Sequence, residues 1–559
     1  MLTIKQEPIF QGEETEFSTK KLIFSCAISE LAGKCIDLAP YITPERFRFV
    51  SRNSLAFHSI LDIYEFEELP WDDHSAVSYP WKGVPVLSSQ SESSGTFSVR
   101  AAEDADPISI NLLRDIVWAT GHQMKHYIWI DRLSICQSSK KDKSWQIKKM
   151  YTIYKEASVI VVPGGLGRLT RSDEETTWMD RVWTFQEAVA PSDSQVHVLF
   201  AYDSSRPFEQ RMDRIGFVKP QLKLSQSDNP FRTPFVLADT SCALVLLGDV
   251  LDIVNYSHVR AFGFRQIQAL SLQRSRAFIE GHHSDGYGIW QSVQMRTSSR
   301  PVDMVFSVMH LFNVSLDPSH FSVDDRNGAA IALIKQILQR THDEGERKMK
   351  GHWLGALYFI TPSPQISTLP LFPETSVGGL AYVVQADGER RLAVDIMEKY
   401  ISDVKGTFRM YLFPDGGKDF GKMDDTGCYT FKARFLLPIL RAGDSTSNSN
   451  SESTKGWNET GPILAADGSQ WHIDKTGKAH IKDAEALGIY FGQNSKNFDV
   501  FLIVESYQNG KKIGLKGPRY RRVSHVLLDC TNDLKENDSD FVQRKWFQYV
   551  DCSKTICIE

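Results

Sequence analysis

The spacing of apolar residues between positions 70 and 190 changes repeatedly from that of a strand to that of a helix. Three apolar runs, at residues 76–81, 127–131 and 158–162, are too short for helices and therefore predict strands. Between these runs the apolar residues recur every three or four positions, as on one face of a helix. Alternating strands and helices are typical of an α/β domain with a parallel sheet. The predicted helices occupy residues 107–120, 142–157 and 179–188.

The segments on either side of this domain follow other hydrophobic patterns. Residues 60–69 alternate apolar and acidic side chains, which predicts a half-buried strand. The apolar segments Cys242–Val254 and Asn327–Arg340 predict helices. After residue 351, β-rich runs separated by turns such as Ala466-Asp467-Gly468 predict an antiparallel β domain. The predicted organisation is an N-terminal preamble (1–70) packed on an α/β domain (71–200), a helical region (201–350) and a β-rich C-terminal domain (351–559).

Composition and charge narrow the class of protein. The chain has 559 residues, 42% of them hydrophobic and 24% charged, which is an ordinary globular composition. A net charge of -5 argues against nucleic-acid binding driven by bulk charge. Since no apolar run is long enough to span a bilayer, we expect no membrane span and a cytoplasmic location.

The cysteines are scattered along the chain and form no recognisable motif. Because no CxxC pair occurs, we expect no metal site, no disulfide framework and reduced thiols. The eight cysteines are Cys26, Cys35, Cys136, Cys242, Cys428, Cys530, Cys552 and Cys557.

Candidate ligand-binding residues gather where the predicted strands end. In open α/β sheets, ligands bind at the carboxyl ends of the strands. Tyr79 and Trp81 end the first strand, Asp131 and Arg132 follow the second, and the Gly-rich segment Pro163–Arg168 follows the third. That segment lacks both the GxGxxG spacing and the Lys-Ser/Thr of phosphate-binding loops, so it indicates a loop beside a pocket rather than a nucleotide fingerprint.

The last predicted helix combines aromatic and acidic side chains. Trp183 and Glu187 are four residues apart and share a helix face, and Asp180 lies about one turn earlier. In one interpretation Trp183 packs in the core and Glu187 is a solvated or capped acid. In the other, Glu187 is a functional carboxylate. The residues alone leave both interpretations open.

Three blocks of sequence, in this order, resemble the fungal heterokaryon-incompatibility (HET) domain. They are Ala76–Gly83, Tyr127–Gln137 and Met179–Ala188, the last of which is similar to the family's "R-x-W-T-x-Q-E" block. The resemblance covers about residues 70–190 and is looser to about residue 310, where Ser299–Val308 is similar to a later block. The HET domain is similar in fold to the TIR domain, so the resemblance implies a flavodoxin-like sheet.

Many TIR domains hydrolyse NAD, and this resemblance implies a catalytic role for Glu187. The TIR glutamate lies in a "W-C-x-x-E-L" block after a strand, and Trp183 and Glu187 have the same spacing. The block departs from that pattern at Thr184, which stands where the cysteine does. Cleavage of the nicotinamide–ribose bond passes through an oxocarbenium-like centre, which a carboxylate stabilises. NAD is then a substrate, and no cofactor or metal is required.

Six further residues are candidates for substrate binding, each with a structural alternative. The aromatic rings could stack on nicotinamide or adenine, or pack in the core. The aspartate could bind ribose, or accept from backbone donors in the next turn. The arginines could meet the pyrophosphate, or neutralise neighbouring acids. His74 and His126 are expected at the surface. The six are Tyr79, Trp81, Asp131, Arg132, Arg181 and Trp183.

Two classes of function are consistent with these residues. The first is an NAD-cleaving effector of nonself recognition and programmed cell death, activated by self-association or by an incompatibility-partner protein. The second is a catalytically silent, TIR-like module that signals by assembly. An enzyme acting on another nucleotide or a small metabolite is a variant of the first class.

Overall fold

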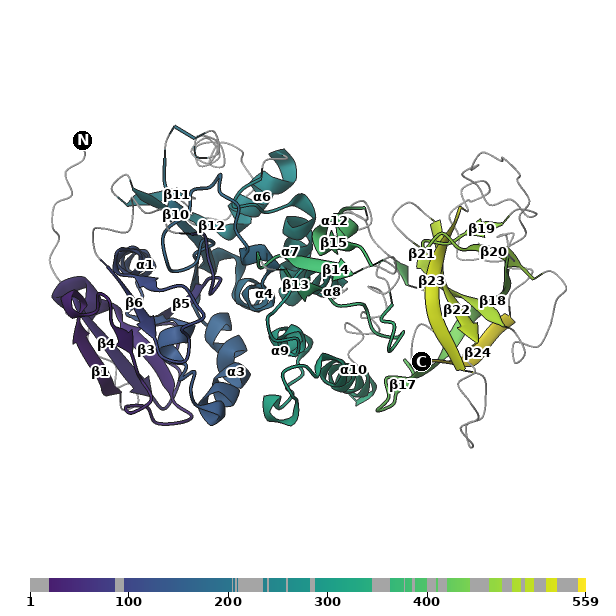
Figure 1. Cartoon of the computed structure of the whole chain (residues 1–559), viewed down its shortest axis with the longest axis horizontal. Coiled ribbons are helices and arrows are strands. Elements are labelled where there is room, and N and C mark those ends of the chain that lie inside the picture. Colours follow the sequence, from purple (N-terminus) through teal and green to yellow (C-terminus); the bar gives the residue numbers. More distant parts are fainter. Residues whose placement is uncertain are drawn as a thin grey trace. The chain divides into compact units, whose positions relative to one another are not determined.

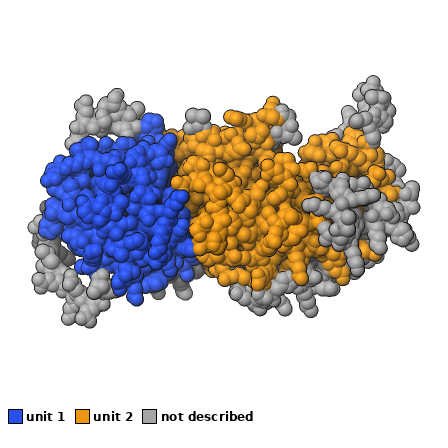
Figure 2. Space-filling model, turned by 60° about the horizontal axis from the view of Figure 1, so that its bottom comes forward, with its two compact units in different colours: residues 1–171, 195–205, 215–245 blue, residues 172–194, 206–214, 246–559 orange. Residues whose placement is uncertain are grey.

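The chain folds into two compact units, which Figure 2 shows in different colours. Unit 1 comprises residues 1–171, 195–205 and 215–245, and unit 2 comprises residues 172–194, 206–214 and 246–559. The computed structural model describes residues 20–85, 95–203, 205–206, 209, 235–238, 241–257, 260–281, 287–343, 362–376, 378–384, 388–399, 409–410, 420–442, 462–474, 485–493, 498–506, 519–529 and 551–559.

The described part of unit 1 is built on a nine-stranded mixed sheet (Figure 1). At its centre β8 pairs with β5, β5 with β9 and β9 with β10, all in parallel. Along the chain β5 comes first, β8 second, β9 third and β10 fourth. Across the sheet these four strands therefore lie in the order second, first, third, fourth. The three predicted strands are thereby confirmed. In sheet order the strands are β1 (Lys21–Ala27), β4 (Ile60–Phe66), β3 (Phe47–Ser51), β8 (Tyr127–Trp129), β5 (His74–Ser78), β9 (Ser158–Val161), β10 (Val196–Ala201), β12 (Cys242–Leu246) and β11 (Phe235–Ala238).

Helices α1 (Ile110–His122) and α3 (Lys140–Lys155) cover the two faces of the parallel strands. Successive strand residues point to opposite faces. Val77 and Ile160 therefore join the core cluster that holds the apolar side of α1. Trp129 faces the other way and packs edge-on against Tyr154 of α3, with ring centroids 5.4 Å apart. Both predicted crossover helices are confirmed. A short helix, α2 (Asp131–Ser134), and a small sheet of β2 (Cys35–Ile36), β6 (Thr96–Val99) and β7 (Ile108–Ser109) complete this region.

Residues 20–66 add antiparallel strands to the same sheet. β4 pairs with β1 on one side and β3 on the other, and β3 pairs with β8. The half-buried strand predicted at residues 60–69 is confirmed as β4, in which buried and partly buried positions alternate.

A buried ion-pair network holds this antiparallel part against α3. The Arg48 side chain, which is fully buried, donates to Glu65 at 3.0 Å and to both carboxylate oxygens of Asp142 at 2.9 and 2.8 Å. It also donates to the carbonyl oxygens of Ser134 and Thr43. All three guanidinium nitrogens of Arg48 therefore have acceptors, which is the condition under which a buried charge is tolerated.

The helix predicted at Cys242–Val254 is wrong over its first five residues. Cys242–Leu246 forms β12, which pairs antiparallel with β11, and α6 begins only at Leu247. A short apolar run fits a buried strand as well as a buried helix, so the available partner strand decides its conformation.

Unit 2 begins with a set of helices. α4 packs against α7, α8 and α9, and the helix predicted at Asn327–Arg340 is confirmed as α10. The helical elements are η3 (Trp178–Asp180), α4 (Val182–Val189), α6 (Leu247–Ser257), α7 (Gln266–Ile279), α8 (Tyr287–Gln294), α9 (Asp303–Met309), α10 (Arg326–Asp343) and α12 (Ala393–Glu398). A three-stranded sheet contains β13 (Glu374–Thr375), β14 (Ala381–Val384) and β15 (Arg390–Leu392).

The C-terminal part of unit 2 is a closed β-barrel (Figure 1). The long strand β18 pairs with both β21 and β24, so the ring β18–β21–β22–β23–β24 closes on itself. All these pairings are antiparallel except β23–β24, so the predicted antiparallel β character of the C-terminal part is confirmed. The ring strands are β18 (Tyr429–Arg441), β21 (Ala486–Gln493), β22 (Phe498–Ser506), β23 (Arg519–Asp529) and β24 (Asp551–Ile558). Short strands β16 (Arg409–Met410), β17 (Lys422–Met423), β19 (Ile463–Leu464) and β20 (Gln470–Ile473) flank them.

The turn predicted at Ala466–Gly468 is confirmed. It joins β19 to β20, and Gly468 adopts a φ of +84°, which favours glycine. Among the described residues, no helix is long and apolar enough to cross a membrane. Within that same part of the chain, no group of three or more His, Cys, Asp or Glu side chains is placed to hold a metal ion.

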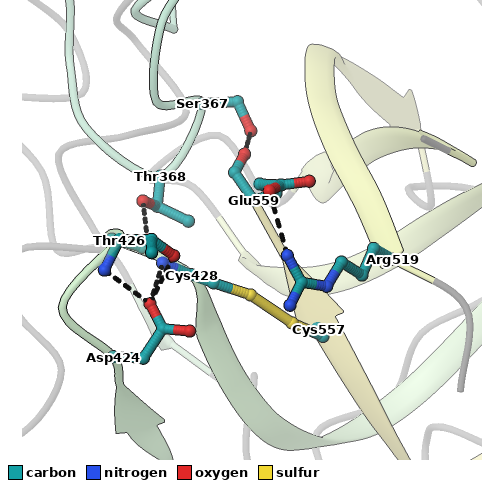
Figure 3. The surroundings of a disulfide bond; sticks show 9 residues. Ser367, Thr368, Asp424, Thr426, Cys428, Arg519, Cys557 and Glu559 are labelled. Atoms are coloured by element: carbon teal, nitrogen blue, oxygen red, sulfur yellow. Dashed lines mark hydrogen bonds and ion pairs between the residues drawn. A yellow bond between two sulfur atoms is a disulfide. The ribbon is translucent and has the colours of Figure 1, made fainter. Parts of the chain in front are cut away.

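A disulfide joins the residue before β18 to strand β24, which corrects the expectation of reduced thiols (Figure 3). Cys428, next to β18, is bonded to Cys557 of β24, 129 residues away. The strand register places Thr430 opposite Cys557 and so brings the two cysteines together. Spacing along the sequence carries no signal for such a pair, because only strand pairing decides it. Cys26, Cys35, Cys136 and Cys242 take part in no disulfide among the described residues.

Removing this disulfide is expected to destabilise the barrel. Cys428→Ser should lower its free energy of unfolding by about 2–4 kcal/mol, because the crosslink restricts a long loop in the unfolded chain. Urea unfolding, followed through hydrogen exchange of the β18 and β24 amides, measures the loss. Cys35→Ser, at an exposed free cysteine, is the control. If a thiol reductant leaves the wild-type midpoint unchanged, the crosslink does not stabilise the barrel.

Candidate functional site

The loops that follow β5 and β9 meet backbone to backbone at the carboxyl edge of the sheet. The amide of Val84 donates to the carbonyl oxygen of Gly164 at 2.9 Å. A Cβ on Gly83 would lie 1.8 Å from that oxygen, so only glycine fits there. The order of the parallel strands reverses between β5 and β9, and ligands of open α/β sheets bind at such a reversal.

The carboxylate of Asp131 is the centre of the side-chain cluster at this edge. Asp131 follows β8, and one of its oxygens accepts from the Tyr79 hydroxyl and from the Arg132 amide at 2.6 Å. The other oxygen accepts from the indole nitrogen of Trp81 at 2.5 Å. The structure therefore brings together four predicted residues from two strand ends. It also confirms that Asp131 accepts from a backbone donor in the next turn.

The Arg132 side chain contacts both the ring and the hydroxyl of Tyr79. Its guanidinium lies 5.3 Å from the ring centroid, and its Nε donates to the Tyr79 hydroxyl at 3.1 Å. Nη1 donates to the carbonyl oxygen of Asp106, whereas Nη2 is buried without an acceptor among the described residues. Burial, and then the charge of Asp131, raise the pKa of Tyr79 well above its usual range, so the hydroxyl keeps its proton.

The predicted residues of the third block lie in unit 2, within α4 and its N-cap. Arg181 is the N-cap residue of α4, and its carbonyl oxygen accepts from the Thr184 hydroxyl at 2.7 Å and from Arg296 at 2.9 Å. The Arg296 guanidinium also lies 5.1 Å from the centroid of the Phe185 ring. The predicted helix at 179–188 is thus a 3-10 turn followed by α4, because Arg181 is extended.

Trp183 connects two of the blocks that resemble the HET domain. Its indole nitrogen donates to the carboxylate of Asp303 at 3.1 Å, and Asp303 begins α9. The Ser298 hydroxyl donates to the same oxygen at 3.3 Å. Trp183, which is half-buried, is therefore held by the helix start at residues 299–308, consistent with a structural role for that segment.

Two acids of unit 2 share a buried arginine. Asp180 and Glu187 are each 7% exposed, and the charges of both raise the pKa of Arg296. Burial has the larger, opposite effect and lowers that pKa to about 9, so Arg296 is protonated at neutral pH. Burial raises the pKa of Asp180 to about 7, against the attraction of Arg296. Gln186, the residue before Glu187, is fully buried, with no partner for its amide among the described residues.

Sequence reasoning missed several residues that hold these side chains. Asp106 accepts from Arg132 and, through its carboxylate, from the Gly83 amide at 2.6 Å. Arg296 contacts the third block from more than 100 residues away. His74, expected at the surface, is fully buried, and its ring nitrogens lie 3.0 and 2.9 Å from the carbonyl oxygens of Pro70 and Ile153. Burial also lowers the His74 pKa, because an apolar site disfavours the charged ring.

Comparison with known families identifies the region that contains the strand-end cluster. Residues 74–168 match the model of the family described as heterokaryon incompatibility protein (HET). The chain therefore carries a HET domain, and the resemblance is confirmed for the first two blocks. The match ends before α4, so the block that contains Glu187 lies outside it. No curated protein and no solved structure matches the chain.

Proposed function

We propose that this protein acts in heterokaryon incompatibility and that it does so by cleaving NAD. The match of residues 74–168 to the HET family supports the biological role. Glu187 is the proposed catalytic carboxylate, NAD is the proposed substrate, and self-association is the proposed trigger.

The strand order supports a TIR-like, flavodoxin-like assignment for the parallel part of unit 1. An order of second, first, third and fourth strand is the one found in flavodoxin-like sheets. In those folds the ligand lies where the order reverses, which is the edge where Tyr79 and Asp131 meet. An acceptor supplied by a phosphate would satisfy the Arg132 Nη2 group, whose burial without a partner costs about 1–3 kcal/mol.

The single observation that carries the proposed chemistry is the buried carboxylate of Glu187 on α4. The charge of Glu187 raises the pKa of Arg296, so the carboxylate and the guanidinium attract each other. When the nicotinamide–ribose bond breaks, nicotinamide leaves as a neutral molecule and the ribose carbon becomes cation-like. A preorganised carboxylate stabilises that charge without needing a general acid. Water then completes the hydrolysis.

Free nicotinamide measures this activity directly. Purified protein is incubated with NAD, before and after clustering through a bivalent antibody to a terminal tag. Glu187→Gln keeps the size of the side chain and removes its charge, so it should lower the rate about 10²–10³-fold. Glu175→Gln, at an exposed acid of the same unit, is the matched control and should leave the rate unchanged.

Two outcomes contradict the proposal. If wild type and Glu187→Gln release nicotinamide at equal rates, Glu187 is not the catalytic group. If neither releases nicotinamide even when clustered, NAD cleavage is not the function.

The second candidate, a silent assembly module, is favoured by one observation: both Asp131 oxygens already accept hydrogen bonds from the protein itself. Sedimentation velocity on the same samples detects assembly without chemistry.

A further inference from the structure

A cavity of about 470 Å³ lies in unit 1, away from the cluster around Asp131. It lies between one side of α1 and the π-helical turn η2 (Ser54–His58), and it is partly open to solvent. Arg52, which lines it, donates through its amide to the carbonyl oxygen of His126 at 2.9 Å, just before β8. Asp131 follows the other end of β8. The cavity therefore lies toward the amino ends of the parallel strands, opposite to the cluster.

Two stacked rings line one side of this cavity, and polar and apolar groups share the rest of its surface. Trp118 and His122 are one helical turn apart on α1, and their rings stack with centroids 6.2 Å apart and an interplanar angle of 19°. Leu55, Leu113 and Val117 supply aliphatic surface beside them. Its volume falls in the range of small-molecule sites, about 300–1,000 Å³. Such a wall suits a planar ring, which gains dispersion and stacking energy on an indole face.

The charged groups that line the cavity are basic. Arg52 and Arg114 both line it, and the lining residues that the structure describes include no aspartate or glutamate. The Nε of Arg52 is buried and has no acceptor among the described residues, and Nη1 reaches Asn53 only at 3.4 Å. Burial lowers the pKa of Arg52, because the charged form loses hydration. An anion in the cavity would accept a hydrogen bond from Nε and would stabilise the charged form of Arg52.

The local backbone fixes the position of the Arg52 guanidinium. A Cβ on Gly121 would lie 2.4 Å from Nη2 of Arg52, so the guanidinium rests on the bare backbone of the last turn of α1. The negative end of the helix accounts for one cation at that point. It does not account for Arg114, which lies near the opposite end of the same helix and also lines the cavity. Two guanidinium groups therefore line this cavity, and an anion there would pair with both.

We propose that this cavity binds a small planar aromatic anion, that is, a ring bearing one phosphate or carboxylate group. The ring lies on the face of Trp118 and His122, and the anionic group meets Arg52 and Arg114. This site is separate from the proposed NAD chemistry and does not depend on Glu187.

Isothermal titration of the full chain tests the proposal. The probes are adenosine monophosphate, which combines a ring with a phosphate, and 1-naphthoate, which combines a ring with a carboxylate. Adenosine and inorganic phosphate each supply one half and should bind at least about tenfold more weakly. Binding of the first probe alone identifies a nucleotide site, and binding of the second alone identifies an aromatic carboxylate site. Binding of neither overturns the proposal.

Variants assign the binding to this cavity. Arg52→Met and Arg114→Met should each weaken binding about tenfold or more, since each removes a charge-assisted contact. Arg114 is exposed, so its replacement leaves the fold intact. Arg100→Met, at an exposed arginine of the same unit, should bind as wild type does. Affinities unchanged in both cavity variants would overturn the proposal. Release of nicotinamide plays no part in these titrations, so failure of the NAD proposal remains distinguishable.

Discussion

Arg48→Met is expected to destabilise unit 1 by about 3–5 kcal/mol. The side chain is fully buried, and its removal leaves the carboxylates of Glu65 and Asp142, 4% and 0% exposed, without their counter-ion. A buried charge that loses its partner cannot be rehydrated while the fold is intact, so the cost falls on the folded state. Urea unfolding, followed through hydrogen exchange of the β3 and β4 amides, measures the change.

Arg46→Met provides the matched control two residues away. Arg46 pairs with Glu67 at 2.9 Å, but both side chains are exposed, 37% and 56%. Water screens such a pair, so its loss should change the free energy of unfolding by no more than about 1 kcal/mol. Equal, small losses for the two variants would show that the buried network contributes no more than a surface pair.

Asp180→Asn is expected to stabilise unit 2, and the gain should grow with pH. Burial raises the pKa of Asp180 from 3.8 to about 7 in the folded protein. The folded state therefore holds this proton more tightly than the unfolded state, and wild-type stability falls as pH rises from about 4 to about 7. Asparagine does not ionise and escapes this loss. The difference between variant and wild type should increase by roughly 2–3 kcal/mol between about pH 5 and about pH 8.

Urea midpoints of the two proteins at both pH values measure this effect. Asp173→Asn is the control, because Asp173 is partly exposed and pairs with Arg206 at 2.9 Å. Its difference from wild type should stay nearly constant over the same pH range. A constant difference for Asp180→Asn as well would mean that Asp180 is ionised without cost and that the attraction of Arg296 offsets its burial.

Much of the fold follows from local patterns in the sequence. The short apolar runs around Val77, Ile128 and Ile160 became the parallel strands, because such runs bury both faces only inside a covered sheet. Cys242–Leu246 shows the limit of this reasoning. Its residues fit a strand or a helix, and pairing with β11 decided between them. Partners distant in sequence are invisible to a local pattern.

For the candidate site too, local patterns predicted some contacts and left others to the tertiary structure. Strand ends predicted that Tyr79, Trp81 and Asp131 would lie close together, because parallel strands end at one edge of a sheet. No periodicity indicated that Arg296 would contact the Thr184 hydroxyl, at 3.1 Å, or that Asp303 would accept from Trp183. These contacts join helices whose packing depends on the whole of unit 2.

The sequence by itself determined the parallel strands, their covering helices and the β-rich character of the C-terminal part. It also showed a HET resemblance over about residues 70–190, of which the family match confirms residues 74–168. Each of these features depends on the spacing of residues a few positions apart, because side-chain periodicity follows backbone geometry over that range. The tertiary structure alone decided the Arg48 network, the barrel closure, the Cys428–Cys557 bond and the burial of Glu187. These depend on which distant segments pack together, because desolvation and pairing energies arise only once those segments meet.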